Sequence, residues 1–499
     1  IFSLVNFHAV ELTGEATGEA YGHSLFSQPK ADAFIHIPQF ALNYGRLADL
    51  DIHINWGDRP YSILLDGNIK GDMLAAQNDT LPRIPITKVQ GYITPKKDID
   101  YHGLDLNVNA DHVNLEFINM WTSVIFDNLQ GKATGWARIF GPFKQINIEG
   151  DVVVNEGSLG VPYIGTRYHL INDTVRLRPD NIYFTDAVLY DPQGNPGIRG
   201  HQALATGHLH HNSFKDMSYD ISIKGDNILG YNFTDFGDQN FYGTVYATGE
   251  ITLKGQPGET NIAIKARPER GTTFTYNATS PDKLTDTPFI AYKKREDWTM
   301  AGGDKNKEED PELEAEDIAT NNDMHIDFDL DIDEQSTMNL LMDVRSGDKI
   351  TLNGNGHMLA HYYNKGSFDL YGTYRVSRGT YNLSLQEVIR KNFEFSPDGT
   401  ITFNGEPYAA DLNLQAVHTV TGVSLNDINP RANFSNTTTR VNCLMNIGGK
   451  AREPRITFDF DIPNANDEEK QMVRSLISTD EERNMQVIYL LGMGSFFNT

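Results

Sequence analysis

The segment Ile326-Asp-Phe-Asp-Leu-Asp-Ile332 decides the fold class, because its apolar and acidic residues alternate strictly. Successive side chains of a β-strand point to opposite faces, so the apolar residues share one face and the aspartates the other. The segment therefore predicts a half-buried strand with one face in water. A calcium loop counted from Asp327 does not fit, since Ile332 and Met338 occupy the positions that an EF-hand needs as Gly and Glu.

The same alternation recurs along the chain, at Leu104/Leu106/Val108, Ile146/Ile148, Ile221/Ile223, Ile262/Ile264, Phe368/Leu370, Ile401/Phe403, Leu412/Leu414 and Ile456/Phe458/Phe460/Ile462. We interpret five dipeptides as turns between such runs: Asp66-Gly67, Glu156-Gly157, Asn353-Gly354, Asp398-Gly399 and Asn404-Gly405, the last in a hairpin. Parallel strands would need helical crossovers, and no helical pattern precedes residue 464. The sequence therefore predicts an all-β, largely antiparallel fold.

A degenerate repeat of two glycine-flanked strands is visible three times, at residues 131–150, 243–255 and 366–379. It favours β-modules that share one elongated, curled sheet. We divide the chain into β-modules at 1–130 and 131–301, an acidic loop at 302–323, a β region at 324–463 and a helical segment at 464–499. The acidic loop has few apolar residues, which indicates a solvated segment without a core.

Two helices are predicted at the C-terminal end. The first follows Pro463 and places Met472, Val473, Leu476 and Ile477 on one face. Thr479-Asp-Glu-Glu482 is a capping box for the second, which we expect to run through Met485, Ile488 and Leu491 to Gly492. Together they form a helical hairpin that closes the β-body.

Composition excludes several classes of function. The 499 residues include 67 acidic and 42 basic side chains, and the net charge of −25 argues against a nucleic-acid partner. The single cysteine, Cys443, forbids an intrachain disulfide, and we expect it to be a buried strand residue. His208 and His210 share one strand face that a metal could bridge, but a solvated face is the better interpretation. We expect no metal, no cofactor and no enzymatic activity, because no catalytic motif is present.

The apolar faces allow two architectures that periodicity alone does not separate. If they pack face to face, the chain is a series of β-sandwiches with dry cores. If one sheet curls into an open trough, its apolar face suits acyl chains, whose burial contributes ~0.8 kcal/mol per methylene.

Several stretches resemble the C-terminal region of TamB, within the AsmA-like group: Gly194-Asn-Pro-Gly-Ile-Arg-Gly200, Gly379-Thr-Tyr-Asn-Leu-Ser-Leu385, Phe393-Glu-Phe-Ser-Pro-Asp-Gly399, Asp459-Phe-Asp-Ile-Pro463, Leu476-Ile-Ser-Thr-Asp-Glu-Glu482 and Val487-Ile-Tyr-Leu-Leu-Gly-Met-Gly494. The resemblance is strong after residue 130 and weak before it. It implies a periplasmic β-taco of a diderm bacterium, with a hydrophobic groove that bridges the inner and outer membranes.

The resemblance also implies function and partners. The family is implicated in moving phospholipid, by its acyl chains, and in assembling outer-membrane proteins with an Omp85-type barrel that resembles TamA. We expect the chain to be a fragment whose inner-membrane anchor lies outside it. We expect ten strand residues to line the groove: Phe328, Leu330, Phe368, Leu370, Ile401, Phe403, Leu412, Leu414, Phe458 and Phe460. We assign binding of the barrel partner to four helical residues: Met472, Leu476, Met485 and Leu491.

The strongest alternative from another class is an extracellular adhesin or structural β-repeat protein with dry cores. A β-helical carbohydrate lyase comes third. Only the groove interpretation predicts that phospholipid accompanies the purified chain.

Overall fold

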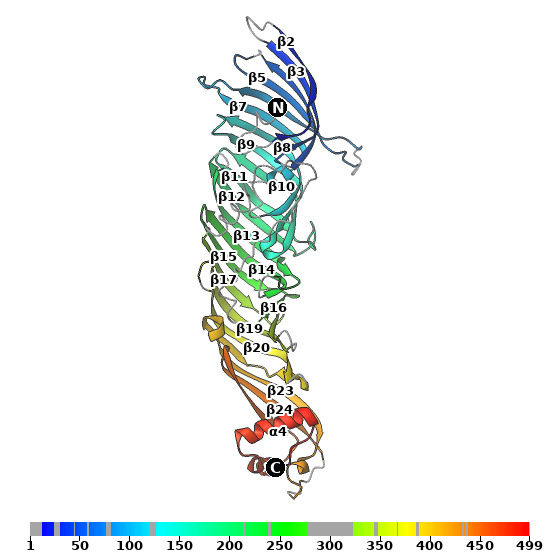
Figure 1. Cartoon of the computed structure of the whole chain (residues 1–499), viewed down its shortest axis with the longest axis vertical. Coiled ribbons are helices and arrows are strands. Elements are labelled where there is room, and N and C mark those ends of the chain that lie inside the picture. Colours follow the sequence, from blue (N-terminus) through cyan, green and yellow to red (C-terminus); the bar gives the residue numbers. More distant parts are fainter. Residues whose placement is uncertain are drawn as a thin grey trace, which may run out of the picture. The chain divides into compact units, whose positions relative to one another are not determined.

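The computed structural model describes residues 12–23, 30–43, 45–56, 59–75, 81–119, 126–212, 215–237, 241–277, 323–343, 348–366, 368–385, 389–431, 434 and 438–498. These residues form a large, mostly antiparallel sheet of 25 strands, and two α-helices follow it (Figure 1). The predicted all-β, curled antiparallel sheet with a C-terminal helical hairpin is confirmed. The acidic segment 302–322 lies outside the described residues, and Asp323 is the first residue of a strand.

The chain divides into two compact units. The N-terminal unit comprises Ile1–Leu229, Glu250–Asn261 and Tyr292–Asn322, and the C-terminal unit comprises Gly230–Gly249, Ile262–Ala291 and Asp323–Thr499. Three long strands contribute residues to both units: β13 (Lys215–Phe233), β14 (Phe241–Gln256) and β15 (Glu259–Pro268).

The N-terminal unit contains twelve further described strands: β1 (Leu12–Thr13), β2 (Thr17–His23), β3 (Lys30–Leu42), β4 (Gly45–Trp56), β5 (Ile63–Lys70), β6 (Ile86–Thr94), β7 (Gly103–Asn114), β8 (Asp127–Gly141), β9 (Asn147–Val161), β10 (Thr166–Arg178), β11 (Asn181–Tyr190) and β12 (Gln202–Asn212). Two single-turn 3-10 helices interrupt them, η2 (Glu116–Ile118) and η3 (Pro162–Ile164). From β2 to β13 each strand pairs antiparallel with the next along the chain.

One rim of this sheet curls over a small core. The Asn114 side chain at the end of β7 donates to the Arg46 carbonyl of β4 at 2.9 Å, although β5 and β6 lie between these strands in the sheet. Beneath this contact, Ile37, Leu50 and Ile69 are buried, and Phe117 of η2 packs against them. The curl lets neighbouring strands of a single sheet form a core without a second layer.

The C-terminal unit contains ten further described strands: β16 (Thr273–Asn277), β17 (Asp323–Ile332), β18 (Thr337–Asp343), β19 (Asp348–Tyr363), β20 (Phe368–Leu385), β21 (Ile389–Phe395), β22 (Thr400–Gly405), β23 (Asp411–Val423), β24 (Thr439–Lys450) and β25 (Glu453–Asp461). It also holds η5 (Pro407–Ala409), η6 (Leu425–Asp427), α3 (Asp467–Leu476) and α4 (Asp480–Met493). β16 and β18 pair in parallel, which departs from the antiparallel pattern.

Three of the five predicted turn dipeptides, Asp66-Gly67, Glu156-Gly157 and Asn353-Gly354, lie inside strands, so those predictions are wrong; Asp398-Gly399 does lie at a turn. Gly354 gives the reason: a Cβ atom there would come within 2.2 Å of the Arg375 carbonyl oxygen, at a shift in register between β19 and β20. Such glycines permit close cross-strand approach. Asn404-Gly405 ends β22, and η5 makes the connection to β23 in place of a tight hairpin.

The proposed repeat also needs correction. Residues 243–255 fall within the single strand β14, and residues 366–379 lead into the single strand β20. The internal glycines therefore mark positions within long strands. Only residues 131–150 span two strands, β8 and β9.

Candidate functional site

A continuous apolar stripe crosses the N-terminal unit. Eleven residues, one from each strand from β3 to β13, pair directly with their neighbours in register and so share one face of the sheet: Ile35, Ile52, Gly67, Val89, Val108, Ala137, Gly150, Leu177, Ile182, Leu209 and Tyr219. We call these residues the apolar stripe. A parallel row on the same face adds Ala33, Ile54, Leu65, Gly91, Leu106, Ile139 and Ile148.

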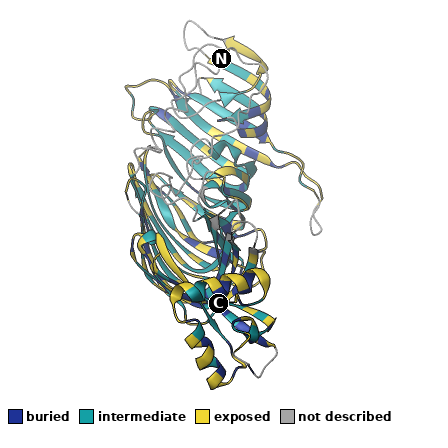
Figure 2. Cartoon of the chain, turned by 60° about the horizontal axis from the view of Figure 1, so that its bottom comes forward, coloured by how far each residue is buried: buried dark blue, intermediate teal, exposed yellow. Residues whose placement is uncertain are grey.

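The apolar stripe is only partly withdrawn from water. Apart from Gly67 and Gly150, its residues have intermediate exposure, and the strands from β7 to β11 contain few buried side chains (Figure 2). A close-packed interior would leave residues such as Val108 and Ile182 fully buried. The stripe is therefore an apolar surface that water or an apolar ligand can still reach.

The opposite face of the same strands is charged. Arg138 of β8 forms ion pairs with Asp105 of β7 at 2.8 Å and Glu149 of β9 at 3.3 Å. Arg178 contacts Asp151 at 3.3 Å, and Lys70 contacts Asp51 at 2.6 Å. Exposed pairs of this kind contribute little to stability, of the order of 0 to 1 kcal/mol each. They place the charged side chains on the face of the sheet opposite the apolar stripe.

One acidic residue, Asp173, lies on the apolar face of β10. Its Oδ1 accepts the backbone N–H of Val188 at 2.9 Å, beside a bulge in β11 between Phe184 and Ala187. Burial raises the pKa of Asp173, because the charged carboxylate is poorly solvated there. The side chain thus satisfies a backbone N–H group beside the bulge.

The C-terminal unit seals its apolar face. Leu352, Phe393, Val441, Cys443 and Met445 are almost completely buried. Burial raises the pKa of Cys443 to about 12, and the prediction of a buried strand cysteine is confirmed. Helix α4 packs against β25, β24 and β21, and adds its own residues to this core. Complete burial of a side chain such as Leu or Phe contributes about 1.5 to 3 kcal/mol, so this end of the chain is a conventional packed interior.

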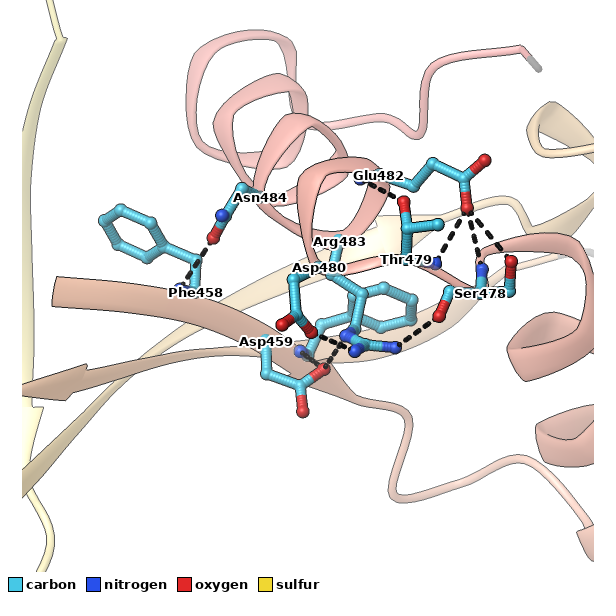
Figure 3. A network of polar contacts seen from close by, with 9 residues as sticks. Phe458, Asp459, Ser478, Thr479, Asp480, Glu482, Arg483 and Asn484 are labelled. Carbon is cyan, nitrogen blue, oxygen red and sulfur yellow. Dashed lines mark hydrogen bonds and ion pairs between the residues drawn. The ribbon is translucent and has the colours of Figure 1, made fainter.

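Polar contacts hold helix α4 on the last strand (Figure 3). The Asn484 side chain accepts the backbone N–H of Phe458 at 2.8 Å, which satisfies a donor on the outer edge of β25. Arg483 donates to the Ser478 carbonyl at 3.3 Å and pairs with Asp480 and Asp459. These contacts tie α4 to β25.

Both helices begin with a capping box. The predicted box at Thr479 is confirmed: Glu482 N donates to Thr479 Oγ1 at 3.2 Å, and Thr479 N donates to Glu482 at 3.0 Å. Backbone N–H groups of Thr479 and Ser478 hold the pKa of Glu482 below its ordinary value. The sequence analysis missed the equivalent box of α3, between Asn466 and Glu469, whose Asn-x-x-Glu spacing was a readable signal.

A comparison with protein families now bears on this geometry. The family model described as the TamB C-terminal domain matches residues 197–496, more than half of the chain. The chain belongs to the TamB family. No curated protein matches it. Membership places the chain among translocation and assembly module proteins, which are associated with the envelope of diderm bacteria.

The ten predicted groove residues of this TamB-family chain fall into two groups. Ile401 and Leu414 are buried in the core of the C-terminal unit. The other eight are partly exposed, and six of these pack against that core: Leu330, Leu370, Phe403, Leu412, Phe458 and Phe460. The expectation that all ten line one open surface stays a prediction, and for the two buried residues the packing is that of a dry interior.

The four predicted partner-binding residues differ in their exposure. Leu491 is fully buried and Leu476 packs against the core, whereas Met472 and Met485 are exposed. The predicted second helix is confirmed as α4, in which Ile488 is exposed and the buried residues are Gln486, Val487, Leu490 and Leu491. The helix is apolar on more than one side, so its periodicity did not single out the buried face.

The aspartate and histidine residues considered as metal ligands all lie in strands. Asp327 and Asp331 lie in β17 and contact His361 at 2.6 Å and His357 at 2.8 Å, which confirms the strand interpretation. His208 and His210 lie in β12, opposite Asp220 and Ser218 of β13. Within the described ranges, no three His, Cys, Asp or Glu side chains lie close enough to hold a metal ion. No helix in the described part of the chain is long and apolar enough to cross a membrane.

The apolar stripe was not among the predicted sites. The alternation at Leu104/Leu106/Val108 and Ile146/Ile148 predicts strands there, but the predicted groove residues all follow residue 327. A signal was present in the alternating apolar residues of strands β3 to β13 and in the lack of a helical pattern in this part of the sequence. Register between strands, which joins the residues into one stripe, required the structure.

Proposed function

We propose that this TamB-family chain is a non-enzymatic periplasmic carrier of phospholipid, whose acyl chains lie against the apolar stripe of the N-terminal unit. We further propose that it works between the inner membrane and an Omp85-type barrel of the outer membrane, resembling TamA. The half-exposed, continuous stripe is the observation that carries this proposal.

The chemistry of the stripe favours acyl chains over other ligands. Its residues offer aliphatic side chains and glycines with few polar groups, which suits a ligand that makes no directional hydrogen bonds. Each methylene withdrawn from water contributes ~0.8 kcal/mol, so a lipid tail gains affinity in proportion to the length that it lays on the stripe. Because no side chain selects one tail position, the lipid can slide from strand to strand.

The C-terminal helices support the second part of the proposal. Met472, Met485, Ile488 and Met493 are exposed on α3 and α4, beside a sealed core. Methionine-rich apolar surfaces adapt to partners of varied shape. We therefore assign contact with the barrel partner to this exposed surface, and assign Leu476 and Leu491 to the packing that supports it.

Lipid analysis of the purified chain tests the carrier proposal. The wild-type chain should carry phospholipid that organic extraction and native mass spectrometry detect. The double variant Val108→Asp/Ile182→Asp should lose most of it, because charges on the stripe oppose acyl chains. The control variant Tyr183→Asp, on the opposite face of β11, should retain it.

A lipid-free wild-type chain would contradict the proposal. It would favour the structural β-repeat alternative, for which the packed core of the C-terminal unit is the supporting observation. Equal lipid loss in the stripe variant and the Tyr183 control would also contradict it, since the effect would not depend on the face of the sheet.

A further inference from the structure

A hollow lies on the N-terminal unit, on the face of the sheet opposite the apolar stripe. Two neighbouring rows of side chains, each paired in register across β2, β3, β4 and β5, line it: Glu19, Phe34, His53 and Asp66 in one row, and Thr17, His36, Asp51 and Asn68 in the other. Its volume is about 550 Å³. Small-molecule sites commonly have volumes of about 300 to 1,000 Å³. We call this site the Phe34 hollow.

Phe34 contributes an exposed aromatic ring to the hollow. The ring stacks on the imidazole of His53, with the ring centroids 4.3 Å apart and the planes 3° from parallel, and Phe34 remains 55% exposed. A single exposed apolar residue needs no explanation. Phe34 differs because hydrogen-bonding side chains of both neighbouring strands surround it, Glu19 on β2 and Asp51 on β4 among them. An aromatic ring among a few polar groups is the typical lining of a small-molecule site.

Neighbouring side chains hold two carboxylates of the hollow in place. Asp51 contacts Lys70 at 2.6 Å and His36 at 2.7 Å, and these contacts lower the pKa of Asp51 below its ordinary value. Asp66 accepts a hydrogen bond from the Gln90 side chain at 2.9 Å. An ionised carboxylate offers about four acceptor positions. Asp51 and Asp66 are therefore oriented acceptors that can each take further hydrogen bonds from a ligand.

The chemistry of the hollow selects a class of ligand. Its carboxylates repel phosphates and other anions. Within the described residues, no three His, Cys, Asp or Glu side chains lie close enough to hold a metal ion. An organic cation is disfavoured at Asp51, because the Lys70 ammonium already pairs with it. A sugar ring suits both features of the site, since its C–H groups can pack on an aromatic face and its hydroxyl groups can donate to carboxylates.

We propose that the Phe34 hollow binds a neutral sugar ring of a glycan, with the C–H face of the sugar on Phe34 and its hydroxyl groups donating to Asp51 and Asp66. The proposal goes beyond the carrier function and does not depend on it. Because the hollow and the apolar stripe lie on opposite faces of the same strands, a glycan in the hollow leaves the stripe open.

Calorimetric titration of the full chain with two neutral oligosaccharides, cellotetraose and the tetramer of N-acetylglucosamine, tests the proposal. The wild-type chain should bind at least one of them, and Phe34→Ala should weaken that binding about tenfold, because the packing on the ring is lost. Phe34→Tyr keeps the ring and should bind like wild type. Since Phe34 is exposed, both variants should keep the wild-type thermal transition. Trp136→Ala, which removes an exposed ring from the same face of β8, is the matched control and should bind like wild type.

A second variant tests the polar half of the site. Asp66→Asn keeps the size of the side chain but removes its charge, and should weaken binding about fivefold. The proposal is overturned if wild type binds neither oligosaccharide, if Phe34→Ala binds as well as wild type, or if Trp136→Ala weakens binding equally. It is also overturned if the cation spermidine displaces the bound oligosaccharide, because the hollow would then be a cation site. A chain that binds the oligosaccharide but carries no phospholipid would contradict the carrier function alone.

Discussion

Both units consist of strands with alternating apolar residues, but they bury their apolar faces to different extents. In the C-terminal unit, helices α3 and α4 cover the last strands, and residues such as Phe393 and Met445 are completely buried. In the N-terminal unit, the apolar stripe keeps intermediate exposure. The difference lies in the covering elements, because the strands of both units have the same period of two.

This comparison shows what alternation means in a TamB-family chain. A strand with one apolar face must place that face against something, which is either the rest of the protein or a ligand. Helices that cap the face convert it into a packed core that stabilises the fold. Where the described structure places no α-helix over the face, as along the apolar stripe, the face keeps intermediate exposure.

Truncation after Pro463 should have the largest effect on the stability of the C-terminal unit. It removes α3 and α4 and so exposes core residues such as Met445 and Cys443. We expect the C-terminal unit to lose its cooperative thermal transition and to bind a dye for exposed apolar surface, while the N-terminal unit keeps its own. The truncated chain should also fail to capture the barrel partner in a pull-down. An unchanged thermal transition would show that the helices do not seal this unit.

A matched pair of substitutions should separate the packed core from the apolar stripe. Leu414→Asp places a charge in the packed core and should destabilise the C-terminal unit by about 3 to 5 kcal/mol. Ile182→Asp, on the partly exposed stripe, should cost about 1 kcal/mol, because its carboxylate can still reach water. Urea unfolding measures both. Equal costs would mean that the stripe is as closely packed as the core.

Low pH should weaken the capping box at the N-terminus of α4. Because hydrogen bonds in the folded state lower the pKa of Glu482, its contribution is fully present above its ordinary pKa of 4.5 and is lost as pH falls through the lower folded value. Glu482→Gln should remove this part of the pH dependence, whereas Glu481→Gln, in the same helical turn, should not. Thermal melts of the C-terminal unit between pH 3 and 7 would contradict this expectation if both variants behave alike.

Deletion of residues 302–322 should have the smallest effect. The segment has too few apolar residues to offset the entropy of ordering them, so neither unit should lose stability. The deletion must spare Asp323, which lies in β17 and contacts Lys365 at 2.6 Å. A loss of several degrees in the thermal transition of either unit would show that the segment packs against it.

The sequence predicted the fold better than the site. Alternation and capping boxes are local signals, so strand β17, helix α4 and the all-β class could be predicted from neighbouring residues. The turn predicted at Gly354 is wrong because a glycine that allows close cross-strand approach has the same local signature as one in a turn. The burial of Leu414 and the exposure of Ile182 depend on which distant segment covers each strand, and periodicity carries no information about that.

Site-specific photo-crosslinking in cells shows whether phospholipid contacts the apolar stripe. Ile182 belongs to the apolar stripe, and Tyr183 lies on the opposite face of β11. Leu414 lies in the packed core of the C-terminal unit. We predict that residue 182 captures phospholipid and that residues 183 and 414 do not. Capture at residue 414 but not at residue 182, or no difference between residues 182 and 183, would contradict the account.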